Sequence, residues 1–138
     1  MAKFQLRILT AEDIKLDEPV DMIIMRVVMD VMGKHTPTGE LGILPNHVPL
    51  CGVLGTDPLR IFNEGEERRM AVFGGVVNVR DNVVTLMTEN ALWPDEIDQA
   101  QAKADLERAK AEGSEDKTDL QRALVQVDVG SYSATGRK

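Results

Sequence analysis

Short apolar runs separated by turn residues fill the first two thirds of the chain. Near the start, Phe4, Leu6 and Ile8 alternate with polar residues, so that one face of a strand is buried while the other stays in water. Similar runs follow one another as far as about Thr88, without a helical pattern between them. This succession predicts an N-terminal β-sandwich.

Two pairs of these runs have the spacing of β-hairpins. The runs at residues 59–62 and 68–79 flank "NEGEE", in which Asn63 and Gly65 supply the permissive backbone of a turn. Residues 81–82, an Asp-Asn pair, separate two β-branched runs and predict a second hairpin.

Gly74 and Gly75 fall together inside a strand-like segment. Missing side chains weaken a strand but permit a bulge or the close approach of another backbone. A phosphate-binding loop would instead need the glycines to open a helix, whereas "GGVVNVRD" continues as a strand. We therefore interpret the pair as a packing feature.

The pattern becomes helical in "NALWPDEIDQAQAKADLERAKAEG". Pro94 suits a first helical turn, acidic residues follow it, and Lys110 lies near the end before Gly113, so one helix is predicted. Its apolar residues form two stripes, Ile97, Ala100 and Ala104 on one and Ala102, Leu106 and Ala109 on the other. Such small residues let another helix approach closely but bury little area.

A second, shorter helix is predicted after the connector "GSEDK". Thr118 and Gln121 have the spacing of a capping box, and Gly130 ends the pattern. Its amphipathic stripe consists of Leu120, Ala123, Leu124 and Val127. Because isolated helices of this length are marginal in water, the two helices must pack on the sandwich, on each other or on a partner. We expect two domains, residues 1–90 and 91–138, and a sandwich that folds without the helices.

The formal charge of −7 and the pI near 4.8 oppose attraction to a phosphate backbone, so we expect no nucleic-acid partner. Cys51 is the only cysteine, which excludes an intrachain disulfide and argues against a cysteine-based metal site. No apolar run approaches the ~18–20 residues that span a bilayer, and neither end carries a targeting or lipidation pattern. We therefore expect no direct membrane insertion.

The sequence offers no catalytic pattern. Its two histidines, His35 and His47, lie twelve residues apart in loop-rich sequence and do not have the spacing of metal ligands. The motifs of phosphate-binding loops, zinc-binding helices and hydrolase nucleophiles are missing, and acidic residues mostly occupy helix starts or solvent faces. We expect neither catalysis nor a metal site.

The segment Thr38–Leu50, "TGELGILPNHVPL", has the character of a rigid, displayed corner. Glycines flank Glu40, and prolines bracket the three residues that contain His47 and hold them extended or turned. From these residues alone, His47 is best explained by hydrogen bonds at a sheet edge.

The segments "GELGILPNHVPL", "LRI", "AVFGGVVNVRDNVVTLM" and "EIDQAQAKADLERA" occur in this order and together resemble the ε subunit of bacterial and chloroplast F-type ATP synthases. The resemblance implies a non-catalytic subunit whose sandwich joins the γ subunit to the c-ring. It also implies helices that inhibit ATP hydrolysis by contacting the α and β subunits. Such a subunit is peripheral, on the cytoplasmic face of the cell membrane.

The same resemblance implies roles for individual residues. Glu40, with Gly42 beside it, would lie in a glycine-flanked loop that faces the c-ring, and His47 would lie toward the γ subunit. Arg108 and Arg122 lie on helices whose extended form would reach acidic surface on the catalytic subunits.

Some members of the family bind ATP in the folded hairpin through the pattern Ile/Leu-Asp-x-x-Arg-Ala and further arginines on the helices. The matching positions here are Ile97, Asp98, Gln101 and Ala102, with Arg108 and Arg122 as the further arginines. Gln101 stands where the pattern has arginine, and a neutral donor contributes less than a charged one. We therefore expect no cofactor, and weak or absent binding of regulatory ATP.

A second departure is the stretch "VVMDVMGKHTP", residues 27–37, which is longer than the tight turn expected there. The methionines at positions 22, 25, 29 and 32 have helical spacing, but the β-branched residues around them favour strands. We predict a lengthened hairpin or an adaptable loop, and assign it no function.

The alternative interpretation is a free-standing β-sandwich that binds a ligand and dimerises through its helices. It predicts a homodimer held by Leu120, Leu124 and Val127, without affinity for a γ-like coiled coil. Co-purification with membrane-bound partners separates the two interpretations.

Overall fold

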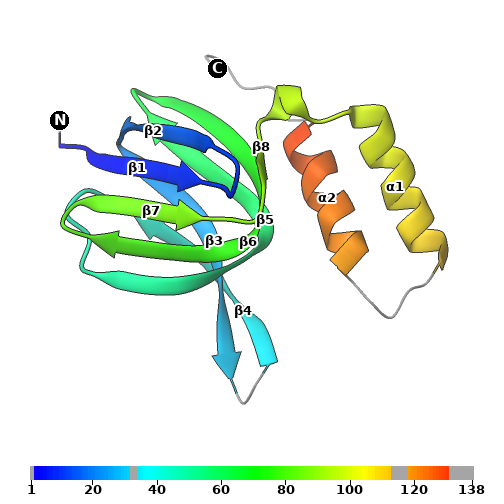
Figure 1. The fold of residues 1–138 in the computed structure, drawn as a ribbon, viewed down its shortest axis with the longest axis horizontal. Helices are drawn as coiled ribbons and strands as arrows, with labels where there is room; N and C mark the ends of the chain where they lie inside the picture. Colours follow the sequence, from blue (N-terminus) through cyan, green and yellow to red (C-terminus); the bar gives the residue numbers. More distant parts are fainter. Residues whose placement is uncertain (1, 32–33, 113–117, 131–138) are drawn as a thin grey trace.

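The computed structural model describes residues 2–31, 34–112 and 118–130, which form a β-sandwich followed by helices (Figure 1). The strands are β1 (Phe4–Leu9), β2 (Ile14–Val20), β3 (Met22–Val31), β4 (Lys34–Ile43), β5 (Leu50–Asn63), β6 (Glu66–Arg80), β7 (Val83–Met87) and β8 (Ala91–Leu92). The helical part consists of the 3₁₀ turn η1 (Pro94–Glu96) and the helices α1 (Gln99–Glu112) and α2 (Thr118–Gly130). The expected β-sandwich and C-terminal helical hairpin are confirmed.

The strands form one hydrogen-bonded sheet that folds over into two layers (Figure 1). Its order is β2-β1-β7-β6-β5-β3-β4, with β8 added to β6. The long strand β6 serves both layers, because Ala71 and Val72 pair with β8 whereas residues from Val76 onward pair with β7. An ion pair between Arg68 and Glu18 joins the first half of β6 to β2.

The core lies between the layers and follows the strand alternation. Phe4, Leu6 and Ile8 are at most 2 % exposed, which confirms the predicted first strand. The largest fully buried side chains are Phe4, Leu6, Ile8, Val20, Ile23, Ile43, Leu59, Ile61, Met70, Val77, Val79 and Leu86. Each such burial contributes roughly 1.5–3 kcal/mol before the loss of conformational entropy.

Both predicted hairpins are present, each with a two-residue turn in the left-handed region. In the β5–β6 turn φ is 55° at Glu64 and 78° at Gly65, and in the β6–β7 turn it is 52° at Asp81 and 61° at Asn82. Turns of this kind match the twist of the flanking strands. One detail of the prediction was wrong, because Asn63 is the last residue of β5 and Glu64 takes the left-handed position instead.

The β3–β4 hairpin accounts for the stretch that was longer than expected. The last pairing of β3 with β5 is Val28 with Val53, whereas β3 and β4 remain paired out to Val31 and Lys34. This ribbon projects from the sandwich (Figure 1). The described residues therefore form a lengthened hairpin. Met25 is buried in the core, but the side chains of the methionines at 29 and 32 lie outside the described part.

The predicted single helix from Pro94 is divided in the structure. The turn η1 ends at Glu96, and Ile97 is extended, with φ −101° and ψ 126°. Helix α1 begins only after Asp98, whose Oδ1 accepts a hydrogen bond of 3.1 Å from the Gln101 N–H. The break arises because Ile97 is buried in the cluster beneath the helices, which holds the chain extended there.

Helix α2 lies between α1 and the sandwich (Figure 1). Residues from β6, the linker and both helices form one buried cluster, namely Ala71, Phe73, Ile97, Ala102, Val125 and Val129. Of the two stripes predicted on α1, the one with Ala102 faces inward, while Ala100 and Ala104 are exposed.

The stripe predicted on α2 is only partly correct. Ala123 is buried and Val127 packs against the cluster, but Leu124 is 40 % exposed. Val125 and Val129 are buried in its place, because α2 has neighbours on two sides and needs a wider apolar face than one stripe. The side chain of Leu120 lies outside the described part.

We expected the Gln121 side chain to reach back to the start of α2, but it bonds to the sandwich instead. Its Nε2 donates a hydrogen bond of 2.9 Å to the carbonyl oxygen of Thr56 in β5. This bond ties α2 to the sandwich, and the Thr118 side chain lies outside the described part.

Candidate partner-binding sites

Glu40 lies in a strand, not in the glycine-flanked loop that we expected. It sits in β4 directly opposite Arg26 of β3, and its side chain is exposed. The strand continues through Gly42, opposite Ile24, because β3 offers unbroken antiparallel pairing there. A Cβ added to Gly42 would meet nothing within 4 Å, so packing does not require glycine at this position.

Glu40 borders an open cleft of about 380 Å³ between strands β3 to β6 and helix α2. The charged residues that line it are Arg26, Glu40, Asp57, Arg60, Arg69 and Asp128. Partial burial raises the pKa of Asp57, against the opposing charge of Arg26. The cleft is lined by three positive and three negative side chains, so their charges balance. Glu40 lies on the edge strand β4 and lines the same cleft as residues of α2.

His47 occupies the corner between β4 and β5. Its Nδ1 lies 2.7 Å from the Val48 carbonyl oxygen, and because a carbonyl only accepts, Nδ1 carries the proton. The preceding residue, Asn46, has φ 62° and donates its N–H to Oδ1 of Asn82 at 2.7 Å. The corner is thus attached to the β6–β7 turn, and Val48 is 70 % exposed at its tip.

The structure does not bring Glu40 and His47 together. The cleft beside Glu40 includes Arg69, near the start of β6, whereas the corner of His47 attaches at Asn82, just beyond the end of β6. If both positions contact partners, they belong to separate parts of the surface.

A row of exposed apolar side chains crosses the outer face of the sheet, and sequence analysis missed it. Val53, Val76 and Met87 lie directly opposite one another on β5, β6 and β7, and they are 40 %, 37 % and 48 % exposed. The sequence signal is that apolar residues follow one another directly in Val76-Val77 and Leu86-Met87. Successive side chains of a strand point to opposite faces, so burial of Val77 and Leu86 leaves Val76 and Met87 on the outer face. Exposed apolar side chains that lie side by side are a candidate contact site for another protein.

The residues of the expected nucleotide pattern serve the fold. Ile97 and Ala102 are buried, and Asp98 caps α1. Gln101 Nε2 donates to Oδ1 of Asp105 at 2.8 Å, and the same oxygen accepts from Arg108 at 2.6 Å.

Arg122 is directed to the sandwich. Its guanidinium lies 5.1 Å from the centre of the Phe73 ring and 3.1 Å from the Glu89 carboxylate. The structure therefore joins Gln101 with Arg108 on α1 and gives Arg122 separate polar and aromatic partners on the sandwich.

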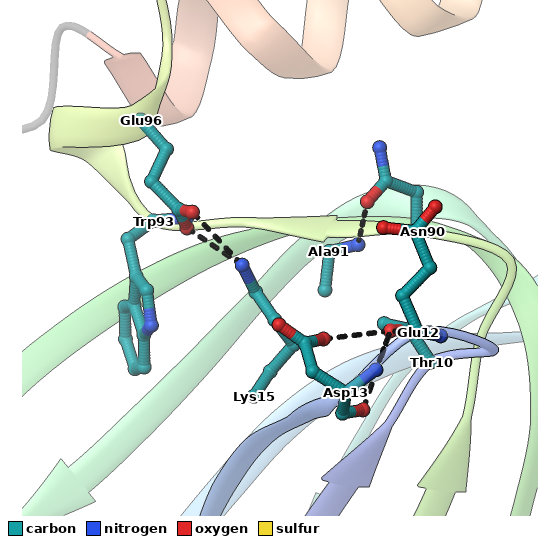
Figure 2. A network of polar contacts seen from close by, with 8 residues as sticks. All are labelled: Thr10, Glu12, Asp13, Lys15, Asn90, Ala91, Trp93 and Glu96. Atoms are coloured by element: carbon teal, nitrogen blue, oxygen red, sulfur yellow. Dashed lines mark hydrogen bonds and ion pairs between the residues drawn. The ribbon is translucent and has the colours of Figure 1, made fainter.

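The linker between sandwich and helices is fixed at Glu96 (Figure 2). Both carboxylate oxygens accept hydrogen bonds of 2.9 Å from Nζ of Lys15 in β2, and Oε1 also accepts from the Trp93 N–H. Burial by itself raises the pKa of Glu96, but the Trp93 N–H and the Lys15 ammonium outweigh it and hold that pKa below its ordinary value. Since β8 also pairs with β6, the chain stays attached to the sandwich as far as Glu96.

We expect Lys15→Met to lower the free energy of unfolding at pH 7 by about 0.5–1 kcal/mol, because it removes the ion pair between the largely covered Lys15 side chain and the exposed Glu96 carboxylate. A lowered pKa stabilises the fold above the ordinary value of 4.5, and that contribution disappears as pH falls through the folded pKa. The difference between the two proteins should therefore shrink in acid. Urea titrations from pH 7 to acid pH measure it, and Lys103→Met on the exposed face of α1 is the control. A difference that is constant with pH contradicts the assignment.

The fold defines a class of protein, a β-sandwich with a docked helical hairpin. Among the described residues, no group of three or more His, Cys, Asp or Glu side chains is placed to hold a metal ion. The family model of the β-sandwich domain of the ATP synthase delta/epsilon chain matches residues 3–94. The chain belongs to the family of ATP synthase epsilon chains.

Named relatives support this membership along most of the chain. The ATP synthase epsilon chain of Caldicellulosiruptor saccharolyticus is 36 % identical over 134 residues, which are 97 % of this chain and 86 % of the relative. That of Brevibacillus brevis is 38 % identical, covering 87 % of this chain and 85 % of the relative. The alternative of a free-standing module is therefore not favoured.

Solved structures agree with the fold. A chain in the OSCP/F1/c-ring part of the Euglena gracilis mitochondrial ATP synthase superposes with a TM-score of 0.70 at 25 % identity, covering 94 % of this chain and 78 % of that one. A chain from the central stalk and c-ring of the Tetrahymena thermophila enzyme has the same fold, with a TM-score of 0.57 at 15 % identity.

Proposed function

We propose that this chain is a non-catalytic subunit of the central stalk of an F-type ATP synthase. Its sandwich joins the γ subunit to the c-ring, so that rotation driven by ion flow reaches the catalytic α and β subunits. The observation that carries this proposal is the exposed apolar row of Val53, Val76 and Met87, in a chain whose relatives are ATP synthase epsilon chains. Such a row on a surface the helices leave uncovered suits a lasting protein contact.

The γ subunit is the proposed occupant of the outer face. The corner with His47 leads directly into β5, where exposed Cys51 and Val53 point to the same side of the strand. The apolar row and the corner therefore form one continuous surface. Glu40 and Gly42, at the edge strand β4, are proposed to meet the c-ring instead.

Co-purification tests this assignment directly. A tagged chain isolated from native membranes under mild conditions should recover the γ subunit and the c-ring in constant proportion. The same tag on an unrelated protein of similar charge is the control. Recovery of the chain as a homodimer without these subunits contradicts the proposal.

The helical hairpin is proposed to inhibit ATP hydrolysis when it leaves the sandwich and extends along γ. The supporting observation is that the buried residues which α1 and α2 supply to the docking cluster are small, namely Ala102, Val125 and Val129. Two packings that differ by a few kcal/mol are able to exchange. In the extended form, Arg108 and Arg122 are proposed to meet acidic surface on α and β.

Deleting residues 98–138 should raise ATP hydrolysis by the assembled enzyme, by about fivefold or more, because couplings between sites are typically of that size. The cut keeps the ion pair of Glu96 with Lys15, and we expect the sandwich to stay folded without the helices. Hydrolysis is measured on complexes with equal subunit content, and the full-length complex is the control. Unchanged or lower hydrolysis in an intact complex would remove the inhibitory role.

The proposed location is the cytoplasmic face of the cell membrane, through the subunits of the complex. None of the described helices has the length and apolar character needed to cross a membrane. Binding of regulatory ATP is proposed to be weak or absent, because Gln101 replaces the arginine of the pattern and Arg122 already has two partners on the sandwich.

A further inference from the structure

Two ion pairs of opposite polarity join α2 to the sandwich. Arg122 of α2 pairs with Glu89, just before β8, at 3.1 Å, and Asp128 of the same helix pairs with Arg69 of β6 at 3.5 Å. The helix thus supplies a cation at one point and an anion about 9 Å further along its axis. A reversed helix would place like charges together and a displaced helix would separate both pairs, so the pairs favour one position of α2.

The same interface has an apolar and a polar contribution beside the charges. The Arg122 guanidinium covers the ring of Phe73, which is 2 % exposed and belongs to the cluster with Val125 and Val129. Gln121, the residue before Arg122, donates to the Thr56 carbonyl oxygen. Arg122 therefore makes both the ion pair with Glu89 and the cation–π contact with Phe73.

These interactions are individually weak. The side chains of Glu89 and Asp128 are 73 % and 50 % exposed, and an ion pair so exposed to water shifts an equilibrium by only about fivefold or less. Several such contacts acting together favour the docked helix without locking it, and salt weakens them.

We propose that the pairs Arg122 with Glu89 and Asp128 with Arg69 form a docking latch. This latch selects the position of α2 on the sandwich and sets how often the hairpin is released. Its effect on ATP hydrolysis rests on the inhibitory function proposed above, whereas its effect on docking does not.

Exchanging the charges of one pair tests the latch in the full-length chain. Glu89→Lys and Arg122→Glu are made singly and together, and amide hydrogen exchange of α2 is followed by mass spectrometry at low salt. Each single variant should speed exchange about 3- to 10-fold, because it removes one pair and creates a repulsion. The double variant should recover most of the protection, because the exchanged charges attract each other again. The contact of the Arg122 guanidinium with the Phe73 ring stays lost.

Arg108→Gln is the matched control, because it removes a pair with Asp105 that lies within α1. It should leave exchange of α2 unchanged, and high salt should reduce the effect of the single exchanges. The latch is overturned if the single variants do not change the exchange rate of α2. It is also overturned if the exchange rate of the double variant rises by the product of the two single accelerations.

Assays on the assembled enzyme separate this proposal from the inhibitory function. Glu89→Lys breaks the pair but keeps Arg122 for its proposed contact with α and β, so this variant should lower ATP hydrolysis. If exchange of α2 responds as expected while hydrolysis does not change, the latch stands and the inhibitory function is wrong.

Discussion

Replacing Gly75 with alanine is expected to lower the free energy of unfolding by about 3 kcal/mol or more. A Cβ at this position would lie 2.1 Å from the carbonyl oxygen of Met87 and 2.8 Å from Cα of Thr88. The backbone there cannot yield easily, because Met87 pairs with Val76 and the Thr88 N–H donates to the Leu9 carbonyl oxygen. In addition, φ is 129° at Gly75, a value that residues with a side chain rarely adopt.

Gly42→Ala is the matched control, since a Cβ at that position meets nothing within 4 Å. Its effect should stay within about 0.5 kcal/mol. Urea denaturation of both variants, followed by circular dichroism, gives the comparison. If Gly75→Ala is as stable as Gly42→Ala, the close approach of the two strands is not a constraint on the fold.

Val76→Glu should weaken binding to the γ subunit by about 100-fold or more, because it places an unpaired charge in the middle of the apolar row. Val76 lies between Val53 and Met87, so the new carboxylate would have apolar neighbours on both sides within the contact. The isolated chain should lose less than about 1 kcal/mol of stability, since the side chain points outward. Calorimetric titration with purified γ subunit measures the affinity.

The control for this change is Ile14→Glu, which alters an apolar residue that is 59 % exposed at the start of β2, outside the row. It should bind γ like the unmodified chain. If Val76→Glu binds with unchanged affinity, the apolar row is not the contact surface, although membership of the family is unaffected.

The sequence by itself determined the elements whose signals are local. The alternation at Phe4, Leu6 and Ile8 specified a half-buried strand, and the Asp-Asn pair at 81–82 specified a tight turn. The strand pattern around the glycine pair at 74–75 favoured packing over a phosphate loop, and the close approach to Met87 bears this out at Gly75, whereas a Cβ at Gly74 would meet only the Leu54 carbonyl oxygen at 3.9 Å. These features depend on residues within a few positions of one another, so periodicity and backbone preference were sufficient.

The tertiary structure alone decided which surfaces these elements present. The buried side of α2 includes Val125 as well as Ala123, because the helix has α1 on one side and the sheet on the other. The expected helix is broken at Ile97 because a cluster from distant segments buries that residue. Glu40 is a strand residue because β3 pairs with it, and the apolar row exists because β5, β6 and β7 place their valines and methionine side by side. Each of these results depends on contacts between residues far apart in the chain, which local patterns do not specify.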